Sequence, residues 1–143
     1  MNPTVRRLAL VALLAAGLPA MAQSLNKVDP QHLYEHWILI NQKVDIDIPN
    51  SARGVNQPGC ASVSYMIGSD GVPRDLKVEK VVPQGDFGQI AMSAVSNFRY
   101  GPSLSNKNHD PVATYYTVPF NAPSDPAGQQ KVMAPCRLTG YAP

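Results

Sequence analysis

Apart from Arg6 and Arg7, the sequence has no two adjacent Lys or Arg residues. Nucleic-acid binding depends on a basic patch that neutralises phosphates, so nucleic acid is disfavoured as a partner. The Gly-x-Ser-x-Gly nucleophile elbow and the glycine-rich phosphate loop are also missing. His109 lies in a polar stretch without either motif and is predicted to be a solvated turn residue. These absences predict a protein that is not an enzyme and needs no cofactor.

The sequence has one long apolar run, residues 8–18, which follows Arg6 and Arg7. Ala20 and Ala22 then give the small-x-small pattern that signal peptidase recognises. The run is shorter than the ~20 residues that span a bilayer. A lipid anchor would need cysteine at position 23, which is Gln. We therefore predict a cleavable signal peptide over residues 1–22 and a soluble mature protein without a membrane span.

Cleavage changes the charge of the chain. The full sequence has 12 Lys+Arg and 10 Asp+Glu, and Arg6 and Arg7 leave with the signal, so the mature chain carries 10 of each. Its length suits one domain with a modest core, and we find no internal repeat.

Both cysteines, Cys60 and Cys136, remain after cleavage. Export places them in an oxidising compartment, where a single pair has one intramolecular connectivity. We expect a Cys60–Cys136 disulfide. Two buried thiols remain an alternative, whereas two isolated cysteines without paired spacing make a poor metal site.

Residues 29–42 have a helical pattern. Asp29 is a plausible N-cap and Pro30 suits the first helical position. The apolar residues fall on one side of such a helix: Leu33, Tyr34, Trp37, Ile38 and Ile40. The same segment contains His-x-x-Glu-His at His32, Glu35 and His36, a zinc motif of inverted zincins. An exposed polar helix face explains these three residues equally well, so zinc is kept as a minor alternative.

The central sequence predicts two strands, a helix and a third strand. Residues 60–67 alternate, with Ala61, Val63, Tyr65 and Ile67 on one face. Asp70 and Gly71 supply a tight turn into a partner strand over residues 74–82, with Leu76 and Val78 facing the core. An amphipathic helix follows, capped by Asp86, with one apolar face: Phe87, Ile90, Ala91, Ala94, Val95 and Phe98. After a polar loop over residues 103–110, the β-branched and aromatic residues 112–120 predict the third strand.

Residues 121–143 are rich in proline and show no periodicity, a composition typical of a disordered tail. A bond to Cys60 would change this, because Cys60 lies on the strand face opposite Ala61 and Val63. The tail is therefore expected to cross the second face or the end of the sheet.

The order and spacing of these elements resemble the C-terminal domain of the TonB energy transducers. The residues that carry the resemblance are Pro49, Ala52, Gly59, Ala61, Val63, Tyr65, Ile67, Asp70, Gly71, Val72, Asp75, Leu76, Val78, Phe87, Ala91, Ala94, Val95, Phe98, Tyr100, Pro102, Val118, Pro119 and Phe120. The resemblance covers residues 49–122, with an N-terminal helix and lead-in over residues 23–48 and a tail over residues 123–143. The fold class it implies is α+β, a β-β-α-β unit with a three-stranded antiparallel sheet. To this unit the chain is expected to add an extra N-terminal helix and a disulfide-tethered C-terminal tail.

The resemblance also implies a role in the periplasm of a Gram-negative bacterium. In the family, this domain binds a peptide of a TonB-dependent outer-membrane transporter, and the peptide adds as a strand to the sheet edge. The corresponding edge here is the third strand, with candidate partner-binding residues Val112, Thr114, Tyr115, Tyr116, Thr117 and Val118. Tyr115 and Tyr116 point to opposite faces, so only one of them can meet a peptide side chain.

Two departures from the family lead to an alternative. Energy transducers keep an N-terminal anchor and a long spacer, so a protein with a cleaved signal is not expected to transmit force by itself. The extra segments at both ends could also cover the strand edge. The alternative is a structural envelope protein whose edge is filled by its own chain or by a second copy, because open edges promote aggregation.

Overall fold

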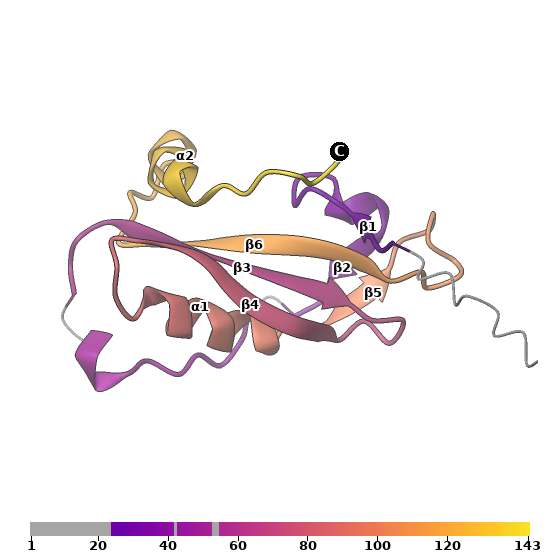
Figure 1. Ribbon diagram of the computed structural model, residues 1–143, viewed down its shortest axis with the longest axis horizontal. Coiled ribbons are helices and arrows are strands. Elements are labelled where there is room, and N and C mark those ends of the chain that lie inside the picture. Colours follow the sequence, from indigo (N-terminus) through magenta and orange to yellow (C-terminus); the bar gives the residue numbers. More distant parts are fainter. Residues whose placement is uncertain (1–23, 42, 53–54) are drawn as a thin grey trace, which may run out of the picture.

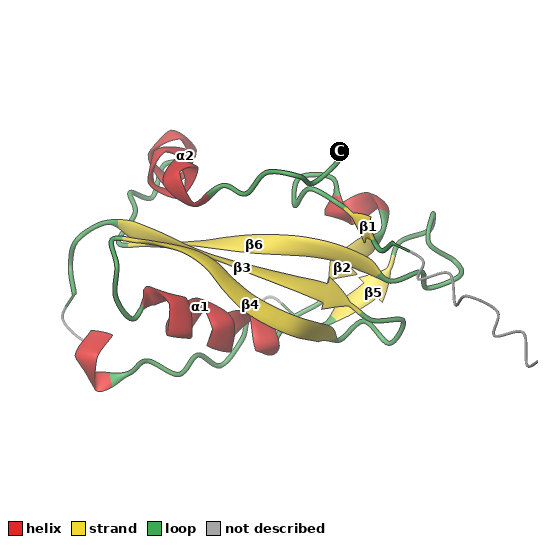
Figure 2. Cartoon of the chain, viewed as in Figure 1, coloured by secondary structure: helices red, strands yellow, loops and turns green. Residues whose placement is uncertain are grey.

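The computed structural model describes residues 24–41, 43–52 and 55–143. The signal peptide expected over residues 1–22 lies outside the described residues. A four-stranded sheet has the order β1-β6-β3-β4, with α1 on one face and α2 and the tail on the other (Figures 1 and 2). Its elements are β1 (Asn26–Lys27), β3 (Gly59–Ile67), β4 (Pro73–Val82), α1 (Phe87–Ser96), β6 (Val112–Phe120) and α2 (Pro126–Met133). A separate ribbon pairs β2 (Trp37–Leu39) with β5 (Tyr100–Pro102), and three 3₁₀ helices complete the chain: η1 (Leu33–Glu35), η2 (Asn50–Ala52) and η3 (Ala134–Cys136).

The predicted hairpin is confirmed. β3 and β4 pair antiparallel from Ile67 with Pro73 to Cys60 with Val82. Gly71 in the turn has φ 76°, and a Cβ there would lie 2.0 Å from the Tyr100 carbonyl oxygen. Only glycine tolerates both this conformation and this approach. The turn thus fixes the β3–β4 hairpin against β5.

The core lies between the sheet and α1, as the apolar patterns predict. Phe87 and Phe98 are 6% and 5% exposed, and the β3 side chains that face them are buried as well. Phe87 also stacks on Phe120 of β6 at 4.2 Å between ring centroids. The helix ends at Ser96, earlier than expected, so that Phe98 packs from the connection to β5. The α+β class and the β-β-α-β order are therefore confirmed.

The helix expected over residues 29–42 is wrong. Within residues 29–41, only the three-residue turn η1 is helical, and β2 begins after a single intervening residue. From Trp37 onward the burial alternates: Trp37 is 1% exposed, whereas Ile38 and Ile40 are 49% and 64% exposed. Pairing with β5 supplies backbone hydrogen bonds for the segment, and β-branched residues favour a strand over a short, marginal helix.

The expected number of three strands is also too small. β1 adds to the outer side of β6 in parallel, pairing Asn26 with Val112 and Lys27 with Ala113. Ala142, near the C-terminus, then pairs with Val28 on the other side of that segment. A two-residue strand such as β1 is too short to show periodicity in the sequence. It forms because the neighbouring Val28 is buried and anchors the segment to the core.

The tail covers the second face of the sheet, and the Cys60–Cys136 disulfide is present. Both cysteines are fully buried, and Ser62 beside Cys60 hydrogen-bonds to the Cys136 carbonyl and to Thr117. Asp125 caps α2 by accepting from the Gly128 amide at 2.7 Å. α2 buries none of its residues, so the disulfide is the main anchor of the tail. No helix in the described part of the chain is long and apolar enough to span a membrane.

A buried tyrosine pair gives the fold a predicted pH dependence. The hydroxyls of Tyr65 and Tyr100 lie 2.6 Å apart in the core. Burial raises the pKa of Tyr65 well above its ordinary value and that of Tyr100 from 10.0 to about 12. The unfolded chain loses these protons first, so stability is expected to fall as the pH rises from 10 towards 12. Urea unfolding across this pH range measures the fall in the free energy of unfolding, and Tyr100→Phe should make that fall smaller. If the free energy of unfolding fell equally steeply with pH in the variant, the buried tyrosine pair would not be its cause.

Candidate functional site: the outer edge of β6

The predicted edge strand, β6, is only partly open. β1 lies along its start, where the Val28 amide donates to the Ala113 carbonyl at 2.8 Å. The Thr114 hydroxyl donates to the Val28 carbonyl, also at 2.8 Å. Val112 and Thr114 are 2% and 0% exposed, so these two candidate residues are not accessible to a partner. Among the described residues, β1 reaches no further along β6, and residues 115–120 have no strand on their outer side.

The backbone alternation of β6 shows which groups face outward. In an antiparallel pair, successive residues direct both backbone groups towards the partner strand or both away from it. Ala113 accepts from Val28 on the outer side, and the register with β3 is regular throughout β6. Tyr115, Thr117 and Pro119 therefore direct their backbone groups outward. Proline is tolerated at position 119 because the missing N–H would not have joined the ladder with β3.

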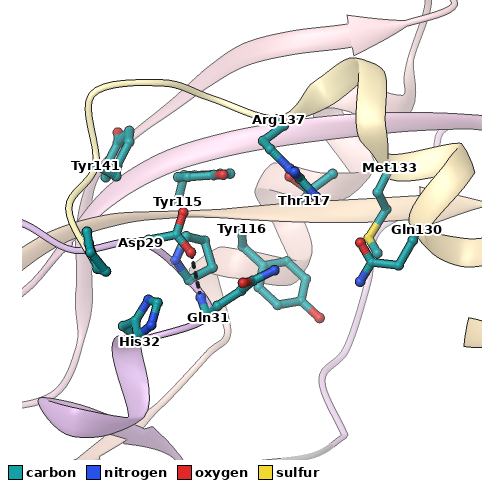
Figure 3. Close-up of a pocket in the computed structure, with 12 residues that line it drawn as sticks. Asp29, Gln31, His32, Tyr115, Tyr116, Thr117, Gln130, Met133, Arg137 and Tyr141 are labelled. Atoms are coloured by element: carbon teal, nitrogen blue, oxygen red, sulfur yellow. Dashed lines mark hydrogen bonds between the residues drawn. The ribbon is translucent and has the colours of Figure 1, made fainter.

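A groove of about 460 Å³ lies beside this open half of the edge (Figure 3). It is lined by Asp29, Pro30, Gln31, His32, Tyr115, Tyr116, Thr117, Gln130, Met133, Arg137, Tyr141 and Pro143. One wall is the segment that leaves β1, and the other comes from α2 and the tail. The groove thus combines outward backbone groups with side chains from both ends of the chain.

Tyr115 and Tyr116 point to opposite faces, as expected from strand alternation. Tyr115 is 4% exposed, and its ring lies 4.8 Å from that of Tyr141 in the tail. Burial raises the pKa of the Tyr115 phenol. Tyr116 is 38% exposed and packs edge-on against Phe98, 5.0 Å away on the α1 face. Tyr116 is therefore the tyrosine that offers surface to a partner, while Tyr115 holds the tail.

The opposite edge of the sheet, β4, is protected against strand addition. Two register shifts interrupt its pairing with β3, and Asp75 has a positive φ of 53°. Exposed charges such as Lys77 and Lys80 lie along it. Bulges and lysines are common devices against edge-to-edge pairing. The open half of β6 carries no charged residue, so the two edges differ in their suitability for a peptide.

The zinc alternative finds no support in the local structure. His32, Glu35 and His36 lie around the short turn η1 and not on one face of a longer helix. No group of three His, Cys, Asp or Glu side chains arranged for metal binding occurs within residues 24–41, 43–52 and 55–143. His32 lines the β6 groove, with its Nδ1 atom buried and without a hydrogen-bond partner. His109 is exposed, and its ring packs edge-to-face with that of Trp37 at 6.1 Å between centroids, in keeping with its predicted place in a turn.

Neither wall of the groove could be predicted from the sequence. Residues 29–32 have a helical pattern, and Met133 and Arg137 belong to a tail without periodicity. The cysteine pair was the one available signal, because it predicted that the tail returns to the sheet.

Comparisons with known proteins give one family. The family model described as "Gram-negative bacterial TonB protein C-terminal" matches residues 47–121, just over half of the chain. A solution NMR structure of the TonB C-terminal domain of Pseudomonas aeruginosa is similar at a TM-score of 0.46 and 23% identity, covering 59% of this chain and 85% of that one. No curated protein matches the sequence.

Proposed function

Because the chain belongs to the TonB C-terminal domain family, we propose that it is a periplasmic protein-binding module that captures an extended segment of an outer-membrane transporter or another envelope protein. The segment adds as a strand beside residues 115–120 of β6. The observation that carries this proposal is the pair of outward backbone positions, Tyr115 and Thr117, which face the 460 Å³ groove. Backbone hydrogen bonds supply affinity in this mode, and the groove walls supply specificity.

The periplasm is proposed on two grounds, the predicted signal over residues 1–22 and the disulfide. Disulfides persist in oxidising compartments such as the bacterial periplasm. Cys60 and Cys136 both lie fully buried in their bonded state.

One observation favours a second candidate, a structural protein with its edge covered by its own chain. β1 already occupies the start of β6, and Ala142 pairs with the other side of the β1 segment. Under this candidate the remaining edge is closed by a second copy of the chain or by further self-contacts.

Amide exchange distinguishes the two candidates at residue level. If the edge is open, the Tyr115 and Thr117 amides are expected to exchange on the order of 10³-fold faster than the Tyr116 and Val118 amides, which point towards β3. NMR exchange rates of the leader-free protein measure this alternation. Slow exchange at Tyr115 and Thr117 in the free monomer would contradict the open edge and support self-coverage.

A matched pair of variants tests strand addition itself. Thr117→Pro removes the outward N–H together with the hydroxyl that contacts Ser62, whereas Thr117→Val removes the hydroxyl alone. Proline at an outward position spares the ladder with β3. Affinity capture from envelope extract should identify a partner that Thr117→Pro loses and Thr117→Val retains. Equal capture by both variants would exclude binding by backbone addition at this residue.

A further inference from the structure

The strongest unassigned feature of the groove is the Arg137 side chain, which comes from the tail and lies outside the region that matches the family model. Arg137 is the only Lys or Arg among the residues that line the groove. The ion pairs within the described ranges are Arg74 with Asp70 and Lys77 with Glu79, so Arg137 forms no ion pair there. The one carboxylate side chain that lines the groove is that of Asp29, which belongs to the opposite wall.

The backbone beneath this guanidinium is fixed. The Arg137 amide donates to the Ala134 carbonyl at 3.2 Å, and its own carbonyl accepts from the Lys80 ammonium at 2.9 Å. The preceding residue is the buried, disulfide-bonded Cys136. The Arg137 side chain therefore extends into the groove from a backbone that is held in place. The Lys80 ammonium, a second positive charge, lies at the Arg137 carbonyl.

The position of Arg137 along the edge defines what it can contact. Figure 3 shows Arg137 over Thr117, on the tail side of β6, with Met133 beside it. Side chains of an added strand alternate between the two faces of the sheet. A peptide residue opposite Thr117 on the tail side would meet Arg137, while its two neighbours would turn to the other face, where Tyr116 exposes its ring.

Resting on the proposed strand addition, we infer that Arg137 selects partners that carry an acidic side chain flanked by apolar residues at this point of the bound segment. A guanidinium matches a carboxylate through two parallel hydrogen bonds and keeps its charge at any physiological pH. The disulfide-tethered tail thereby acts as the specificity wall of the groove, and the open edge of β6 supplies affinity that does not depend on peptide sequence.

Capped peptides provide the test. The probes are short, N-acetylated and C-amidated peptides of alternating threonine and valine, with glutamate, glutamine or lysine at the central position. NMR titration of the leader-free protein reports binding at the Tyr115 and Thr117 amides. The glutamate peptide is expected to bind roughly fivefold more tightly than the glutamine peptide and more tightly still than the lysine peptide. Arg137→Glu should reverse the order of the charged peptides.

Lys131→Glu serves as the control, because it makes the same change of charge on exposed α2 without lining the groove. This variant should keep the preference for glutamate. Equal affinity for all three peptides, or reversal by Lys131→Glu as well, would overturn the role of Arg137 while leaving strand addition intact. No response at Tyr115 or Thr117 to any peptide at millimolar concentration would overturn strand addition, and the role of Arg137 with it.

Discussion

Replacing Cys60 and Cys136 together with alanine is expected to lower the free energy of unfolding by roughly 4 kcal/mol. The disulfide spans a sequence separation of 76, and opening so long a loop increases the conformational entropy of the unfolded chain. The other contacts of the tail are partly exposed, because α2 buries no side chain and Cys136 is the one fully buried residue there. Urea unfolding of the wild type and the double variant measures the loss.

The same variant should release the tail while the β3–β4 hairpin and α1 stay folded. Amides of α2 are expected to exchange rapidly, and the groove should lose its Arg137 and Met133 wall. Tyr141→Ala is the matched control, since it removes the ring that packs on Tyr115 but keeps the cross-link. A loss of stability below about 1 kcal/mol in the cysteine variant, or protected α2 amides, would show that the disulfide is not the anchor of the tail.

The centre of the fold could be predicted from sequence because each element there carries a complete periodic signal. Residues 60–67 alternate without interruption, and α1 repeats its apolar residues over three turns. Local preference and tertiary packing agree at these positions. In residues 29–42 they disagree: the spacing from Leu33 to Trp37 fits a helix, but pairing with β5, far along the chain, decides the outcome.

The candidate site could be predicted only in part, for a related reason. The strand β6 and the opposite orientations of Tyr115 and Tyr116 follow from local alternation. That β1 covers Val112 and Thr114, however, depends on the anchoring of Val28 in the core and on its bridge to Ala142. A contact between residues at the two ends of the chain leaves no trace in the local pattern of either end.

Trp37→Ala is the second substitution with a large expected effect, about 3–5 kcal/mol of lost stability. Trp37 is 1% exposed, and its indole N–H donates to the Asp110 carbonyl at 3.1 Å. Its ring also approaches the β3–β4 turn, where a Cβ on Gly71 would lie 3.6 Å away. Truncation would leave a cavity at the junction of the β2–β5 ribbon, the 103–110 loop and the hairpin. Urea unfolding measures this loss directly.

Tyr34→Ala is the control that makes this prediction specific to the observed fold. Tyr34 and Trp37 would share the apolar face of a helix over residues 29–42, so a helix predicts comparable losses for both. In the structure Tyr34 is 64% exposed, and its truncation is expected to cost no more than about 0.5 kcal/mol. Comparable losses of stability for the two variants would favour the helix and contradict the strand β2. A large loss of stability for Trp37→Ala alone would show that the segment before residues 47–121, the region that matches the family model, completes the core. This packing is needed if residues 29–32 are to form a fixed wall of the groove.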